Sequence, residues 1–303
     1  MVDTCIKTLY EIAQDNAKVV VMGSDSMNIR EIFKEKIPQQ YIEMGIAENN
    51  LVGAAAGVST CGFVPFVYAV APFLVYRALE FIRDDICLQR RNVKIIGYSA
   101  GMDYCTSGPT HHTTEDIAIL RAIPNLTILS PGSVREVREM VKAAAEIEGP
   151  VYIRLARESG REVQSEDYKF KLGVPCILKD GTDVIAFSTG SITYDVLKAA
   201  NKAQENGVSV KVVHLGTIKS LETNIILSEM KDIINVMTIE ENVINGGIGG
   251  MISELVSQAG SGCCVKRIGL NDSFAVGYGN HDEMKEMNRM GVDAIFNEMC
   301  SYH

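Results

Sequence analysis

Short, nearly continuous apolar runs alternate along the chain with segments whose apolar residues recur every three to four positions. An apolar run of four to eight residues is typical of a parallel strand buried on both faces, whereas the second spacing indicates a helix with one buried side. Because the two patterns alternate, the sequence predicts an α/β fold with mostly parallel sheets. The expected strands lie at 18–23, 63–69, 93–99, 126–131, 150–156, 183–189, 208–215, 234–240 and 264–270.

Helices are expected between these strands. In one of them Val134, Val137 and Val141 fall on a single face, and Ser133 followed by Glu136 forms a capping-box pattern at its start. The expected helices lie at 47–60, 73–91, 114–123, 133–149, 192–205, 222–231, 247–259 and 281–299.

The segment 158–182 interrupts this rhythm because it is polar, charged and rich in turn residues. We therefore expect a first domain at 1–165, a linker at 166–182 and a second domain at 183–303.

Composition narrows the class of protein. The 303 residues are 47% hydrophobic and 22% charged, as in an ordinary globular protein. A net charge of −9 argues against nucleic acid or an anionic membrane as the main partner. No apolar run reaches the roughly 18 residues of a membrane span, and the acidic start is unlike a signal peptide. The eight cysteines form no C-x-x-C pair, so we expect reduced thiols in a cytoplasmic protein rather than zinc or disulfides.

Glu48 stands out because it precedes two helical turns of glycine and alanine in "GIAENNLVGAAAG". Small residues let a backbone or ligand approach closely. Desolvation raises the pKa of a carboxylate, and a protonated or proton-sharing glutamate can hydrogen-bond a ligand nitrogen. Taken alone, this residue can equally be an ordinary first-turn acid.

His111 lies in "TSGPTHHTTED", at a junction between a strand and a helix, where open α/β sheets bind ligands. Arg154 and Arg157 follow a buried strand, and arginines there suit a phosphate or carboxylate. Phe73 and Tyr76 are three residues apart and share a helical face. Each feature has an ordinary alternative: local hydrogen bonds, surface salt bridges or core packing, respectively.

Together and in this order, "GIAENNLVGAAAG", "RALEFIR", "GPTHHTTEDIAILRAIPN" and "GPVYIRLAR" resemble the transketolase family of thiamine diphosphate enzymes. The resemblance runs from about residue 18 to the end and covers the second half of a full-length transketolase. It implies a pyrimidine-binding parallel-sheet domain followed by a smaller α/β transketolase C-terminal domain.

The resemblance also implies roles for the residues. Glu48 corresponds to the glutamate that hydrogen-bonds N1′ of the aminopyrimidine and so activates the cofactor. Phe73 would stack on the pyrimidine ring, with Tyr76 beside it. His111 matches a histidine that contacts the sugar substrate, and Arg157 matches an arginine that binds the sugar phosphate.

One family motif is absent. Full-length members hold a divalent ion and the diphosphate with a Gly-Asp-Gly motif, which occurs nowhere in this sequence. The resemblance therefore implies the second subunit of a split transketolase. Thiamine diphosphate would lie between the two chains, and a separate N-terminal subunit would hold its diphosphate and the Mg²⁺ or Ca²⁺. An α2β2 heterotetramer acting on sugar phosphates is expected.

Departures from the family pattern affect the expected substrate. Ser107 replaces an aspartate that contacts the donor sugar, and Ser99 stands where the family often has a histidine. Asp25 is expected near the cofactor and Arg30 near a phosphate, within a shortened segment "GSDSMNIR". The resemblance therefore does not imply a preference for the usual pentulose and hexulose phosphates, and a different sugar phosphate is also consistent with the sequence.

Alternatives remain at this stage. The chain resembles subunits of related enzymes, such as deoxyxylulose-phosphate synthase or the β subunit of 2-oxoacid dehydrogenases, and a non-catalytic scaffold subunit is also consistent with Ser99 and Ser107. The turn "GGIGG" at 246–250 lacks the lysine of a phosphate-binding P-loop, so no chemistry is assigned to the second domain. His281 and Asp282 are expected to serve as cap and first-turn acid of the last helix.

Overall fold

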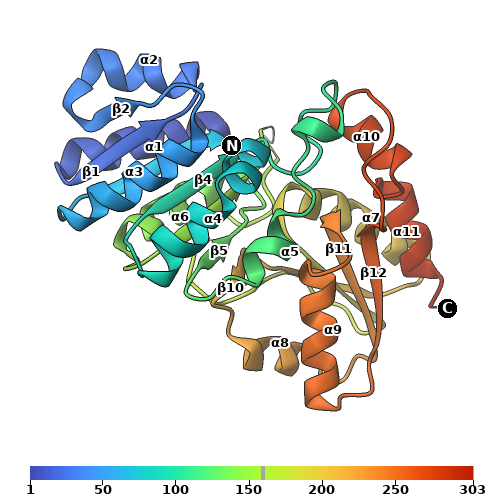
Figure 1. The fold of residues 1–303 in the computed structure, drawn as a ribbon. Coiled ribbons are helices and arrows are strands. Elements are labelled where there is room, and N and C mark those ends of the chain that lie inside the picture. The colour runs from blue at the N-terminus through green and yellow to red at the C-terminus, as the bar shows by residue number, and fades with distance from the viewer. Residues whose placement is uncertain (158–160, 303) are drawn as a thin grey trace.

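The computed structural model describes residues 1–157 and 161–302, which form two α/β units lying side by side (Figure 1). Each unit is built on a mostly parallel sheet with helices on both faces, so the expected fold class is confirmed. No helix in these two ranges is long and apolar enough to cross a membrane.

The first sheet has seven strands in the order β10-β5-β6-β4-β3-β1-β2, and all neighbours are parallel except β10 and β5. Six of its strands come from the first half of the chain: β1 (Val19–Gly23), β2 (Tyr41–Glu43), β3 (Val64–Val70), β4 (Lys94–Tyr98), β5 (Thr127–Leu129) and β6 (Val151–Leu155).

Alternating side chains of these strands supply two separate apolar cores, because successive residues of a strand point to opposite faces. Val20 and Met22 pack into the core on the side of α3, whereas Val19 and Val21 pack into the core on the side of α1, α2 and α6. The helices are α1 (Val2–Asp15), α2 (Met27–Lys36), α3 (Glu48–Thr60), α4 (Leu79–Phe81), α5 (Asp116–Arg121) and α6 (Val134–Glu146), with π-helical segments at Phe73–Arg77 and Ile82–Leu88 around α4.

The second sheet has five strands in the order β12-β11-β8-β9-β7, of which only β7 runs antiparallel to its neighbour. Its strands are β7 (Cys176–Lys179), β8 (Val184–Ser188), β9 (Val210–His214), β11 (Asn235–Val243) and β12 (Cys264–Leu270). The accompanying helices are α7 (Thr193–Glu205), α8 (Thr223–Glu229), α9 (Ile248–Ala259), α10 (His281–Met287) and α11 (Val292–Cys300).

The two units share structure. Strand β10 (Thr217–Lys219) comes from the second half of the chain but pairs with β5 at the edge of the first sheet. One apolar core also continues across both units, since Phe187 of β8 and Ile252 of α9 belong to the same cluster as Leu51 of α3. The boundary at 166–182 stays a prediction, and β10 shows that the halves of the chain are interlocked.

The end of the chain differs from expectation. The single helix predicted at 281–299 is wrong, because it is broken into α10 and α11, and Gly291 precedes the second of them. The predicted cap His281 is also wrong: Asn280 caps α10, in a capping box with Glu283. Asp282 does lie in the first turn, as expected.

The predicted cap of α6 is confirmed, since the Ser133 hydroxyl accepts a hydrogen bond from the Glu136 backbone N–H at 3.2 Å. The Glu136 side chain has another function. It pairs with His214 of β9 at 2.7 Å and accepts a hydrogen bond from the Gly132 N–H, so a buried Glu136–His214 contact joins the two units.

Candidate active site

Glu48 is the first residue of α3 and its carboxylate is buried. The chain enters this helix from the end of β2 through Gly45, whose φ of 68° suits glycine. The Arg77 guanidinium donates a hydrogen bond to Glu48 Oε2 at 3.1 Å. A helix N-terminus favours a carboxylate, so the start of the helix and Arg77 together orient this side chain.

Arg77 joins Glu48 to two other predicted residues. Its guanidinium lies 4.1 Å from the centre of the Phe73 ring, and Phe73 meets the His111 ring edge to face at 5.2 Å. Glu48, Phe73 and His111 therefore form one cluster, although more than 60 residues separate the first from the last. Arg77 was not among the residues selected from the sequence, but its position four residues after Phe73 on one helical face was an available signal.

His111 ends a short 3₁₀ turn, Pro109–His111, within the 101–113 loop after β4. The Tyr104 ring of the same loop lies 5.6 Å from the His111 ring. The Arg157 guanidinium in turn lies 5.6 Å from the centre of the Tyr104 ring. The structure therefore brings Arg157, at the end of β6, to the same side as His111.

Arg154 has a structural role instead. It is buried in β6 and its Nε lies 3.0 Å from Asp116 Oδ2, and the same arginine donates to the carbonyls of Thr113 and Glu241. Of the two arginines noted in the sequence, only Arg157 is exposed at the site.

Tyr76 has other neighbours. Its hydroxyl contacts the Glu115 carboxylate, at a cavity of about 540 Å³ that Phe274 also lines. Its expected place beside the pyrimidine ring stays a prediction.

The remaining predicted residues lie around the cluster. Asp25 has a φ of 51° and is close to Tyr98; burial, Tyr104 and Asp25 raise the pKa of Tyr98 to about 12. Arg30, on α2, acts electrostatically on Tyr41 of the edge strand β2, so its contact with a phosphate stays a prediction.

The two serines differ from each other. Ser107 is exposed in the turn before Gly108, where it is open to a ligand. Ser99 is buried at the end of β4 with a φ of 56°, and its hydroxyl has no hydrogen-bond partner among the described residues.

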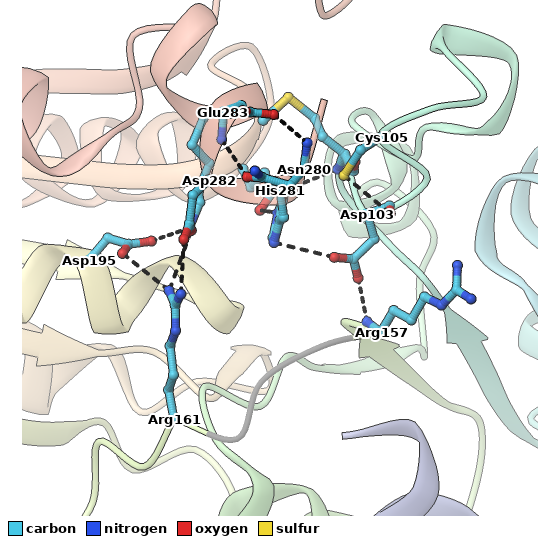
Figure 2. A network of polar contacts seen from close by, with 12 residues as sticks. Asp103, Cys105, Arg157, Arg161, Asp195, Asn280, His281, Asp282 and Glu283 are labelled. Atoms are coloured by element: carbon cyan, nitrogen blue, oxygen red, sulfur yellow. Dashed lines mark hydrogen bonds and ion pairs between the residues drawn. The ribbon is translucent and has the colours of Figure 1, made fainter. Parts of the chain in front are cut away.

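A buried acidic cluster beside this site was not expected. His281 Nε2 lies 2.9 Å from both oxygens of Glu241. On its other side, His281 Nδ1 lies 3.4 Å from Asp103 Oδ1 (Figure 2). Burial opposes the charge of His281, but Glu241 and Asp103 outweigh it and raise its pKa to about 9. Burial raises the pKa of Asp103 to about 6, against the effect of His281.

The glycine-rich turn before α9 is closed by the chain itself. Both oxygens of Glu240 accept hydrogen bonds at 2.8 Å from the backbone N–H groups of Ile248 and Gly249. Because a carboxylate fills the position an anion would take, this helix N-terminus is satisfied internally.

Comparison with known proteins gives the family. The chain matches the transketolase pyrimidine-binding domain over residues 1–162 and the transketolase C-terminal domain over residues 175–295. It belongs to the transketolase family. Membership implies a subunit of a thiamine diphosphate-dependent, transferase-type enzyme.

Several similar proteins in this family are named as subunits. The chain is 32% identical to a subunit of the apulose-4-phosphate transketolase of Actinobacillus succinogenes, covering 96% of this chain and 94% of that protein. It is 30% identical to a 6-deoxy-6-sulfo-D-fructose transketolase subunit of Clostridium sp. (strain MSTE9), covering 94% and 88%. A solved split-gene transketolase, described as an inactive β4 tetramer, is 34% identical with a TM-score of 0.91 and covers 99% and 96%.

Proposed function

We propose that this chain is the C-terminal subunit of a split, thiamine diphosphate-dependent transketolase that transfers a two-carbon ketol unit between sugar phosphates. The observation that carries the proposal is the cluster of Glu48, Phe73, His111 and Arg157. These residues come from four separate segments, which follow β2, β3, β4 and β6 at the C-terminal edge of the first sheet. These residue types offer an acceptor, an aromatic face, a sugar-binding imidazole and an anion-binding guanidinium.

The residues present fit the cofactor's aminopyrimidine. A buried carboxylate lies beside an aromatic ring, and Arg77, which links the two, is about half exposed and free to yield to a ligand. Glu48 would share a proton with N1′ in a hydrogen bond, Phe73 would stack on the ring with Tyr76 nearby, and Asp25 would lie next to the bound cofactor. When bound, thiamine diphosphate supplies an electron sink for the two-carbon unit.

The positively charged Arg157 indicates which end of the site would bind the substrate. His111 would contact sugar hydroxyls, with Ser107 and Arg30 at the periphery. Arg157 would pair with a terminal anion, since guanidinium binds phosphate through two parallel hydrogen bonds. The relatives named above act on sugars with a terminal phosphate or a sulfonate, which agrees with a cation at this position.

A partner subunit is part of the proposal. The described residues contain no group of three or more His, Cys, Asp or Glu side chains able to hold a metal ion, and the sequence has no Gly-Asp-Gly motif. The diphosphate and Mg²⁺ or Ca²⁺ would be held by a separate N-terminal subunit in a cytoplasmic α2β2 assembly. The β4 relative, described as inactive, supports dependence on such a partner.

The test is reconstitution. This chain is purified alone and together with an N-terminal transketolase subunit, and both samples are assayed with ketose phosphates, thiamine diphosphate and Mg²⁺. We expect ketol transfer only from the pair. Turnover by the isolated chain would refute the split-site proposal, and carbon dioxide release from pyruvate would favour a deoxyxylulose-phosphate synthase or a 2-oxoacid dehydrogenase subunit.

A further inference from the structure

The loop that presents Tyr104 and His111 is held at both ends. Gly101 and Thr113 exchange two backbone hydrogen bonds, at 2.8 and 3.0 Å, which close the loop at its base. Between these ends the loop reaches toward α10 of the second unit (Figure 1). These two hydrogen bonds fix the start and the end of the loop. The conformation of the residues between them depends on other contacts.

Those contacts are made by three residues that we call the clasp: Asp103 of the loop itself, and Glu241 and His281 of the second unit. Glu241, at the end of β11, accepts a hydrogen bond from the Met102 backbone N–H. His281, at the start of α10, lies between Glu241 and Asp103 and contacts both. The clasp therefore joins the 101–113 loop to two separate elements of the second unit.

The clasp also reaches Arg157. Asp103 Oδ2 accepts a hydrogen bond from the Arg157 backbone N–H, while the Arg157 side chain extends away from Asp103 (Figure 2). The next residue after His281, Asp282, pairs with Arg161 at 3.0 Å. The start of α10 thus contacts Arg161 directly and Arg157 through Asp103.

His281 is the residue that allows the two acids of the clasp to be buried side by side. The side chains of Glu241 and Asp103 are 4% and 2% exposed, so two carboxylates are buried close together. Like charges in a poorly solvated site repel, and each needs a compensating cation. A protonated imidazole between them satisfies both acids at once. Without it, Asp103 would turn outward and release the Arg157 backbone.

The clasp lies next to a small cavity. A space of about 180 Å³ is lined by Asp103, Tyr104, Arg157, Asn280 and His281, among others. The second unit therefore forms one wall of the space next to the arginine that would bind the sugar phosphate.

We propose that His281 is a positioning residue: through Asp103 and Glu241 it holds the 101–113 loop and Arg157 where they bind the sugar phosphate. This rests on the proposed function. It gives the second unit, to which the sequence assigned no chemistry, a role in substrate affinity.

The variant that tests it is His281→Gln in the reconstituted pair. Glutamine keeps the approximate size and one donor but cannot carry charge or bridge both acids. We expect the KM for the phosphorylated donor to rise about three- to tenfold, with kcat changed less than about twofold. Hydrogen exchange in peptides covering 101–113 should become faster.

Variants of two further residues distinguish a positioning role of His281 from a general effect on stability. His214→Gln disrupts another buried histidine–glutamate pair between the units, whose contacts go to Glu136 and Thr193. It should lower the melting temperature without changing the KM or the exchange of the 101–113 loop. Asp103→Asn keeps one acceptor oxygen where Asp103 uses two, for the Arg157 N–H and for His281, so it should raise the KM less than Asp103→Ala does.

A parental KM in His281→Gln, or unchanged exchange in 101–113, overturns the proposal. A parental pair that is inactive toward every sugar phosphate refutes the proposed function instead. In that case the exchange experiment still decides whether His281 holds the loop, because it needs no turnover.

Discussion

Arg77 places its guanidinium 3.1 Å from the buried Glu48 carboxylate and 4.1 Å from the centre of the Phe73 ring. A single flexible cation therefore aligns the acceptor and the aromatic face that the proposed cofactor would use. Because the Arg77 side chain is 49% exposed, it can leave Glu48 and be solvated at little cost.

Glu48→Gln should separate activity from folding. The amide cannot accept a proton, so turnover of the reconstituted pair should fall at least about tenfold, equivalent to about 1.4 kcal/mol. The melting temperature should change little, because Arg77 becomes solvated rather than buried without a partner. Steady-state kinetics and thermal unfolding measure the two effects. Full activity in this variant would exclude Glu48 from catalysis.

Phe73→Leu should weaken cofactor binding. Loss of a stacked ring costs about 0.5–1.5 kcal/mol, so the apparent dissociation constant for thiamine diphosphate in the assembled pair should rise about two- to tenfold. Phe63→Leu is a matched control, since Phe63 precedes β3 at the opposite end of the parallel strands. A titration that gives equal constants for the two variants would contradict the proposed stacking.

Arg157→Met should reduce affinity for the charged end of the substrate. A hydrogen bond to a charged group contributes about 1.5–3 kcal/mol, so the KM for a ketose phosphate should rise at least about tenfold. The same ketose without its phosphate serves as the control, because it lacks the partner of the guanidinium. If the KM rises equally for the phosphorylated and the unphosphorylated ketose, Arg157 does not bind the phosphate.

Much of the fold follows from local pattern. All nine predicted strands occur, because fully buried parallel strands leave continuous apolar runs such as "KVVVMG". Helix α1 was not predicted, although Val2, Cys5, Ile6 and Leu9 follow helical spacing. Strand β10 offered too little pattern, since it has three residues and joins a sheet formed by the other half of the chain.

The candidate site was predicted only in part, for a physical reason. Glu48, Phe73, His111 and Arg157 belong to recognisable segments, and the structure brings them together. The clasp could not be read from the sequence, because Asp103, Glu241 and His281 are far apart along the chain and only the packing of two units makes them neighbours. Isolated charged residues in loops show no sequence pattern that predicts such burial.

The buried pair of Glu136 and His214 should make the protein sensitive to acid. Burial opposes the charge of Glu136, but His214 and several hydrogen bonds outweigh it and hold its pKa below the ordinary value of 4.5. Its stabilising contribution is therefore complete above about pH 4.5 and is lost as the pH falls through the lower folded value. Glu136→Gln should cost about 1.5–3 kcal/mol at neutral pH, since it removes the charged acceptor of the hydrogen bonds from His214 and the Gly132 N–H. Urea unfolding from neutral to acidic pH measures this, and an unchanged midpoint in the variant would contradict it.

His281 should give the opposite dependence, at alkaline pH. Its pKa is raised from 6.5 to about 9 by Glu241 and Asp103, against burial and the nearby Lys285. A raised pKa means that the contribution is fully present below about pH 6.5 and is lost as the pH rises through about 9. The difference in unfolding free energy between the parental chain and His281→Gln should therefore shrink by about 2–3 kcal/mol between about pH 7 and about pH 10. Comparing the two chains at each pH cancels the titration of distant lysines and tyrosines, so a difference that stays constant would show that His281 is not charged in the folded protein.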